Sequence, residues 1–205
     1  MPKFLDGDGK TALTRAVAAF ESGTAAELVV SVRPRSGTYP RAGILVGTLA
    51  ALITTAFLLY SEPEFDLWWF LVWPAAVGLV LGHAADVRTL QWLLTSAATR
   101  EKRVLEAARA VFVERGIADT RGRTGILLYV SVAERIAVVI PDLGVRQAVP
   151  ATDWDPAVAA ITGAVARGAT ALELVAPIAA LAAVARKHLP RATDDINELA
   201  DAVHT

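Results

Sequence analysis

The stretch TGILLYVSVAERIAVVIPDLGV, Thr124 to Val145, decides the fold. It holds two runs rich in β-branched residues on either side of Ala133 to Arg135, a pattern that predicts two strands joined by a turn. Neither run alternates polar with apolar residues, so we expect both faces of the sheet to be covered. The segment ELVVSV, Glu27 to Val32, predicts one more short strand.

Helical patterns surround these strands. A helix is expected from about Gly9 to Ser22, capped by Asp8 and ended by Gly23. A long amphipathic helix is expected over residues 87–115, continuing from the apolar segment before it and closed by Gly116. Helices of this kind can cover a sheet whose faces are both apolar.

Two further helices are expected near the C-terminus. One runs from about Asp155 to Arg167, with Pro156 near its first turn. The other begins at a capping box made by Thr170 and Glu173, is kinked by Pro177, and stops at Leu189-Pro190 before a polar tail. The elements together predict a small α/β sandwich, a sheet of few strands flanked by helices.

Two long apolar runs interrupt this sandwich. AGILVGTLAALITTAFLLY, residues 42–60, and LWWFLVWPAAVGLVLGHAA, residues 67–85, carry no charged residue. Each would be about 28 Å long as a helix, close to the roughly 30 Å of a bilayer core. They account for the high hydrophobic content of 54% and the mean hydropathy of +0.44. A pair of buried core helices is the alternative, but a transmembrane hairpin is the stronger prediction.

The predicted domain organisation follows from that hairpin. Residues 1–40 form the first part of the α/β domain, residues 41–86 form the hairpin, and residues 87–205 form the rest of the domain with its tail. Gly43 with Gly47, and Gly78 with Gly82, make a GxxxG in each span, which allows close approach within the hairpin or between protomers.

The segment between the spans, YSEPEFD at residues 60–66, concentrates three carboxylates around Pro63. No basic residue lies near them, so a turn is a simpler interpretation than a site. Basic residues flank the other ends of the spans, and the positive-inside rule then predicts an inner-membrane protein with both termini cytoplasmic. These basic residues are Arg33, Arg35, Arg41, Arg88, Arg100, Lys102 and Arg103.

Several kinds of chemistry find no support. The net charge of −1 argues against nucleic acid, and the absence of cysteine excludes thiolate catalysis. No phosphate-binding glycine motif indicates a nucleotide cofactor. DGDGK, residues 6–10, fails as a calcium loop because its twelfth position is Val17. His83, His188 and His204 have no partner at a recognisable spacing, so no catalytic residue is predicted.

Four segments together resemble the TPM domain family. More closely, the chain is similar to the bacterial membrane-protein branch in which a two-helix hairpin splits the domain. Ala25 departs from the family, which usually has serine there. The segments are TAAELVVSV at 24–32, TRGRTGILLYVSVAERIAVVIPDLGV at 120–145, VPATDW at 149–154 and LPRATDDINEL at 189–199.

The resemblance implies possible roles for acidic residues. Some members of the family look like weak acid phosphatases or bind divalent ions through acidic loops, and others act as partners of membrane complexes. The matching metal positions for Ca²⁺ or Mg²⁺ are Glu27, Asp142, Asp194 and Asp195, with Asn197 and Glu198 beside them. The alternative is that Asp142 caps a turn and that Asp194 and Asp195 begin a solvated helix.

Three functions follow in order of preference. The first is a non-enzymatic module that is anchored in the lipid bilayer and binds a membrane-protein partner or a second copy of itself. The second is a weak metal-dependent phosphatase that uses the acidic positions. The third is a component of an oligomeric channel or transporter, because two helices alone cannot enclose a pore.

Overall fold

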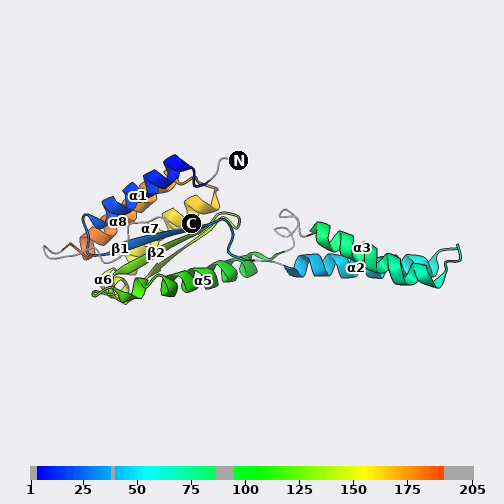
Figure 1. Cartoon of the computed structure of the whole chain (residues 1–205). Helices are drawn as coiled ribbons and strands as arrows, with labels where there is room; N and C mark the ends of the chain where they lie inside the picture. The colour runs from blue at the N-terminus through cyan, green and yellow to red at the C-terminus, as the bar shows by residue number, and fades with distance from the viewer. Residues whose placement is uncertain (1–3, 38–39, 86–94, 192–205) are drawn as a thin grey trace. The chain divides into compact units, whose positions relative to one another are not determined.

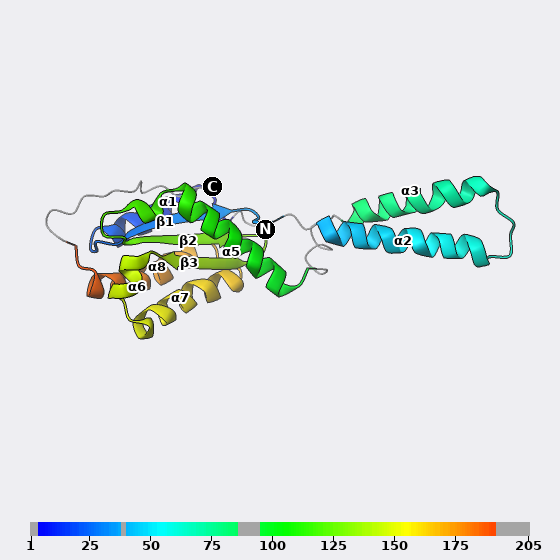
Figure 2. The ribbon, with the colours of Figure 1, turned by 90° about the horizontal axis from the view of Figure 1, so that it is seen from below.

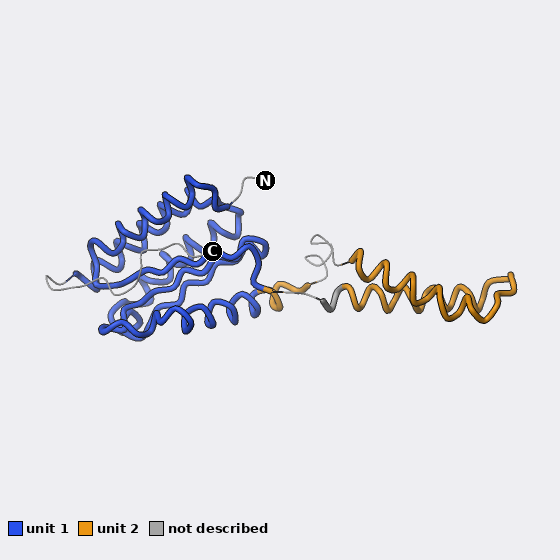
Figure 3. Tube along the Cα trace, in the orientation of Figure 1, with its two compact units in different colours: residues 1–36, 101–205 blue, residues 37–100 orange. Residues whose placement is uncertain are grey.

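The computed structural model describes residues 4–37, 40–85 and 95–191. The chain divides into two compact units, shown in Figure 3. Unit 1 contains the chain up to Ser36 and again from Glu101 onward, and unit 2 contains Gly37–Arg100. Unit 2 is thus inserted in the sequence of unit 1.

A three-stranded mixed sheet forms the centre of unit 1 (Figures 1 and 2). Its strands are β1 (Glu27–Arg33), β2 (Gly125–Ser131) and β3 (Ile136–Pro141), in that spatial order. β1 pairs parallel with β2, and β2 pairs antiparallel with β3. The predicted first strand and the predicted strand pair are therefore confirmed.

Helices cover both faces of this sheet, as expected. On one face α1 (Gly7–Glu21), α7 (Ala151–Ala166) and α8 (Val175–His188) share a core with Leu28 and Leu128. On the other face α5 (Ala97–Glu114) packs on Val29 and Leu127. Successive strand residues point to opposite faces, so a fully apolar strand requires both layers. The remaining short elements are the 3₁₀ turns η1 (Ile117–Asp119) and η2 (Leu172–Leu174) and helix α6 (Leu143–Ala148).

The first helix starts earlier than predicted because its cap is a different aspartate. Asp6 is the N-cap, and its Oδ1 accepts a hydrogen bond of 2.7 Å from the Gly9 amide. Asp8 lies inside the first turn of α1, where its charge favours the helix N-terminus. The prediction of Asp8 as the cap was therefore wrong.

The single long helix predicted over residues 87–115 is also wrong where the structure describes it. Thr95 and Ser96 are not helical, and α5 begins at Ala97. The Ser96 hydroxyl accepts from the Thr99 amide at 3.2 Å, which is a typical N-cap. The helix ends as predicted near Gly116, whose φ of 62° suits glycine. Residues 86–94 lie outside the described residues.

The two C-terminal helices correct two proline predictions. α7 begins at Ala151 because Pro150 serves as its cap, so Pro156 lies inside the helix rather than at its start. Glu173 Oε2 accepts from the Thr170 amide at 2.6 Å, as the capping box requires, but the turn it opens is 3₁₀ and α8 starts at Val175. Pro177 then lies in the first turn of α8, where a backbone amide has no partner within the helix, rather than in the helix interior as predicted.

Unit 2 consists of two packed helices, α2 (Pro40–Tyr60) and α3 (Leu67–Ala85), joined by residues 61–66. Both are long and apolar enough to cross a membrane. Their glycines meet closely: a Cβ at Gly47 would lie 2.6 Å from the Gly78 carbonyl oxygen, and one at Gly82 would lie 3.0 Å from that of Gly43. Both GxxxG motifs are thus used within the hairpin.

Candidate functional site

Two of the predicted metal positions lie at one end of the sheet. Glu27 begins β1 and pairs in register with Gly125, the first residue of β2. The Asp142 amide donates to the Gly125 carbonyl at 2.9 Å, on the β3 side. Glu27 and Asp142 therefore flank one strand, with backbones about 10 Å apart. Asp194 and Asp195, with Asn197 and Glu198, lie outside the described residues.

Asp142 is held by an arginine in a two-point ion pair. Arg123 donates from Nε to Oδ2 at 2.6 Å and from Nη2 to Oδ1 at 2.9 Å. The Asp142 side chain is only 6% exposed, whereas that of Arg123 is 52% exposed. The hydrogen bonds from Arg123 hold the pKa of Asp142 below its ordinary value, although burial opposes them. The carboxylate is therefore ionised and oriented.

Close backbone contacts fix this pair. Gly144 lies two residues after Asp142 in the chain, and its amide donates to the Arg123 carbonyl at 2.9 Å. A Cβ at Gly144 would lie 2.3 Å from the Gly122 carbonyl oxygen, so only glycine fits there. Arg123 itself has a φ of 54°, an uncommon value for a residue with a side chain. The loop before β2 therefore contacts the start of α6 closely, and the Arg123–Asp142 pair links these two segments.

This arrangement limits what Asp142 can do as a metal ligand. Both of its oxygens already accept hydrogen bonds from Arg123, so a cation would bind beside a positive guanidinium that competes for the same carboxylate. Within the described ranges, no three histidine, aspartate or glutamate side chains gather in a way that could hold an ion. A complete site would need the acidic residues that follow Arg191. The metal set of Glu27, Asp142, Asp194 and Asp195 stays a prediction.

A second polar cluster, which the sequence did not predict, lies at the opposite end of the sheet. Ser36 Oγ is 2.8 Å from Tyr129 Oη and donates to Ser131 Oγ at 2.6 Å. Ser131 Oγ donates in turn to a carboxylate oxygen of Glu134. The Ser36 amide lies 3.3 Å from the other oxygen of that carboxylate. We call these four residues the hydroxyl cluster.

The hydroxyl cluster is mostly buried and marks where the chain leaves unit 1. Tyr129 is 1% exposed, and Ser131 is fully buried. Burial raises the pKa of the Tyr129 phenol, and the hydrogen bond with Ser36 partly offsets this effect. Ser36 is the last residue of unit 1 before unit 2 begins. The sequence signal that could have indicated this cluster is a tyrosine and a serine within a strand expected to be buried, because buried polar groups require hydrogen-bond partners.

A third group ties α7 to α8. Asp153 Oδ2 lies 2.7 Å from Lys187 Nζ and 2.7 Å from His188 Nε2. No partner of His188 was recognisable from sequence spacing, because Asp153 belongs to a different helix. The hydrogen bonds from Lys187 and then His188 lower the pKa of Asp153. Trp154 packs on the core.

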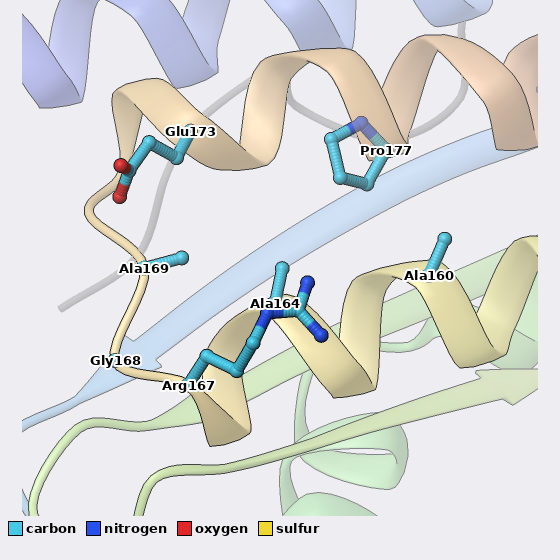
Figure 4. Close-up of a pocket in the computed structure, with 7 residues that line it drawn as sticks. All are labelled: Ala160, Ala164, Arg167, Gly168, Ala169, Glu173 and Pro177. Atoms are coloured by element: carbon cyan, nitrogen blue, oxygen red, sulfur yellow. The ribbon is translucent and has the colours of Figure 1, made fainter.

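An open groove of about 450 Å³ lies between the end of α7 and the start of α8 (Figure 4). Alanine side chains, with Pro177, form its walls, and Arg167 and Glu173 supply charge. Glu173 is already engaged by Thr170. The charged group that the groove offers to a ligand is therefore the Arg167 guanidinium.

Comparison with known proteins shows the fold but no family. No family model matches the chain, and no curated protein matches it. The chain resembles the NMR structure of the BA42 protein from the psychrophilic bacterium Bizionia argentinensis, with a TM-score of 0.60 and 19% identity. The match covers 100% of this chain and 97% of the other. At this identity the likeness extends to the fold alone.

Proposed function

We propose that the protein is anchored in a membrane by α2 and α3, and that unit 1 is a TPM-like, non-enzymatic module that binds a partner at the membrane surface. One observation carries this proposal. The large apolar side chains of unit 2 point outward, with Ile44 67%, Ile53 68% and Leu79 75% exposed. Water would make such a surface unstable, whereas lipid tails would cover it.

The degree of burial argues against core helices. Only 11% of the apolar window in α2 and 6% of that in α3 is buried inside the structure. A core helix of a globular protein buries its apolar face against neighbours. The stacked rings of Trp69 and Trp73, 5.5 Å apart, lie in the first half of α3, where amphipathic rings suit a bilayer interface.

The proposed orientation follows from charge. Residues 61–66 carry Glu62, Glu64 and Asp66 and no basic residue. Arginines and lysines flank the other ends of the two helices in the sequence. By the positive-inside rule, the hairpin tip lies outside the inner membrane, and unit 1 with both termini lies in the cytoplasm.

The partner-binding role is supported by how the ionisable groups of unit 1 are used. Asp142 is paired with Arg123, and Asp153 with Lys187 and His188. These pairs tie one element to another, which is a structural use. The glycine faces of α2 and α3 are occupied by each other. Association with a membrane protein or with a second copy would therefore use the outer faces of the hairpin or the surface of unit 1.

Cysteine labelling tests the anchor and its orientation, since the chain has no cysteine of its own. We expect Glu64→Cys at the hairpin tip to react with a membrane-impermeant maleimide in intact spheroplasts. Ser22→Cys in unit 1 is expected to react only after lysis. The opposite pattern would overturn the orientation, and release of the protein from membranes by alkaline carbonate would overturn the anchor.

Cross-linking tests the partner. Membranes are cross-linked, and the full chain is purified in detergent. We expect one membrane protein, or a second copy of this chain, to be recovered reproducibly. A parallel sample without the cross-linker measures non-specific capture during purification. Recovery of no specific partner would contradict the proposed role.

A metal-dependent phosphatase is the alternative, and one observation favours it: Glu27 and Asp142 share one end of the sheet. Calorimetry with Ca²⁺ and with Mg²⁺ on the full chain separates the two proposals. Binding that Asp142→Asn abolishes, together with phosphatase activity lost in the same variant, would favour the enzyme. If neither metal binding nor phosphatase activity is found, the partner-binding module is the proposal that stands.

A further inference from the structure

One end of unit 1 collects arginines from three distant parts of the chain. Arg33 ends β1, Arg135 lies in the turn between β2 and β3, and Arg167 follows the last turn of α7. The Val132 amide donates to the Arg33 carbonyl at 3.0 Å. The Ala133 amide donates to the Pro34 carbonyl at the same distance. The segment after β1 is thus fastened to the β2–β3 turn.

Gly168 brings the third arginine to the same place. It has a φ of +86°, and a Cβ at this position would lie 3.7 Å from the guanidinium carbon of Arg135. The Arg135 side chain therefore covers the end of α7. Arg167 folds back over its own helix, with Nη1 3.2 Å from the position of a Cβ at Gly163. We call Arg33, Arg135 and Arg167 the arginine end.

The guanidiniums of Arg135 and Arg167 keep their charge available. Within residues 4–37, 40–85 and 95–191, neither Arg135 nor Arg167 forms an ion pair with a carboxylate. Glu134, next to Arg135 in the chain, is 6% exposed and accepts hydrogen bonds from Ser36 and Ser131. An anion that approaches this surface would meet two unneutralised, planar donors.

In the sequence, few residues separate this end of the sheet from the first apolar run. Ser36 belongs to the hydroxyl cluster at the same end of the sheet, and the first apolar run begins at Ala42. Six residues span at most about 20 Å when fully extended. If α2 crosses a bilayer, as the proposed function holds, Ser36 is tethered within that reach of the lipid surface.

We propose that the arginine end docks on anionic phospholipid headgroups of the membrane that the hairpin crosses. Arginine suits this partner because its guanidinium donates two parallel hydrogen bonds to a phosphate. The groove beside Arg167 has small alanine walls and is open, so it leaves room for a glycerol phosphate group (Figure 4). This inference rests on the proposed membrane anchor and adds which face of unit 1 lies against the lipid.

A spin label tests the docking in the full chain. A single nitroxide on Ala133→Cys, between Arg33 and Arg135, reports contact with lipid through its accessibility to oxygen and to a water-soluble nickel chelate. Nanodiscs contain phosphatidylcholine alone or mixed with phosphatidylglycerol. We expect the label to lose access to the nickel chelate only in the anionic nanodiscs, and high salt to restore it.

Charge-matched variants show which cations act. Arg135→Asn with Arg167→Gln removes two charges at the arginine end, and asparagine tolerates the positive φ of position 135. Each cation near an anionic surface changes the docking equilibrium about fivefold, so we expect the ratio of docked to free unit 1 to fall about thirtyfold when both are removed. Arg15→Gln with Arg146→Gln removes the same charge from exposed positions elsewhere and should leave docking unchanged.

Three outcomes would overturn the inference. The first is that the nickel chelate reaches the label equally well in both kinds of nanodisc. The second is that both double variants lose docking to the same extent. The third is that soluble glycerol phosphate, added to phosphatidylcholine nanodiscs, protects the label as anionic lipid does. The last would assign the surface to a free phosphate ester. Failure of the anchor is seen separately, because a chain whose helices do not span would not remain with the nanodiscs at alkaline pH.

Discussion

Units 1 and 2 use the same kinds of apolar residues in opposite ways. In unit 1, Phe20 and Leu128 are fully buried between helices and sheet. In unit 2, Phe57 is 65% exposed and Leu52 is 61% exposed. Burial in unit 1 removes apolar surface from water, which drives folding. The hairpin buries little apolar surface, and its two helices pack through close glycine contacts.

The largest expected effect comes from truncating the same residue type in each unit. Phe20→Ala leaves a cavity under α1 and should lower the free energy of unfolding by about 3–5 kcal/mol. Phe57→Ala removes a ring that faces outward and should change it by less than about 1 kcal/mol in nanodiscs. Hydrogen exchange of peptides from β2 and from α2 measures the two units separately. Equal losses would show that Phe57 packs against protein rather than lipid.

A smaller effect is expected for the Arg123–Asp142 pair. The pKa of Asp142 in the folded state lies below that in the unfolded chain. The stabilisation from the pair is therefore present above the unfolded value, near pH ~4, and is lost as pH falls through the folded value. At neutral pH, Asp142→Asn should lower the free energy of unfolding by less than Phe20→Ala does. It should also flatten the acid limb, which is the fall of that free energy as the pH drops.

The matched control for this prediction is Glu64→Gln in unit 2, an exposed carboxylate at the hairpin tip. It should leave both the stability and the acid limb unchanged. Urea unfolding followed across acidic pH makes the comparison. If Asp142→Asn leaves the acid limb as it is in the unaltered chain, the carboxylate is not oriented as described.

The smallest expected effect concerns a single hydroxyl. Tyr129→Phe removes one hydrogen bond of the hydroxyl cluster and should cost about 1 kcal/mol, because Ser36 still reaches Ser131. Tyr60→Phe, at a tyrosine that is 89% exposed, should cost nothing measurable. Hydrogen exchange near Ser36 should rise in the first variant and not in the second. If hydrogen exchange near Ser36 changes in neither variant, the hydroxyl cluster does not stabilise the segment that follows β1.

Much of the fold was predictable because its signals are local. The β-branched runs around Ala133 marked β2 and β3, and Gly23 and Gly116 marked helix ends. Two of the errors occurred where a neighbouring residue took the predicted role. Asp6 rather than Asp8 caps α1, and Pro150 rather than a later residue opens α7. Alternative cap residues differ by small free energies, so a sequence pattern alone does not show which of them the helix uses.

The candidate site was less predictable because its pairs join distant segments. Asp142 was found as an acidic residue after a strand, but Arg123 as its partner depends on contact between two loops. His188 gained Asp153 only when α7 packed beside α8. The hydroxyl cluster joins Ser36 to Ser131, and Ser131 pairs with Arg33 at the end of β1, three residues before Ser36.

The sequence by itself determined the class of structure and the two helices that are long and apolar enough to cross a membrane. Charge-free runs of membrane length and fully apolar strands follow from composition and period, which act locally along the chain. Only the tertiary structure decided which charges are paired and which are available. Parallel pairing and helix packing bring together residues far apart in sequence, as with Arg33, Arg135 and Arg167 at one end of unit 1. Electrostatic contacts depend on distance in space, and the chain order does not contain that distance.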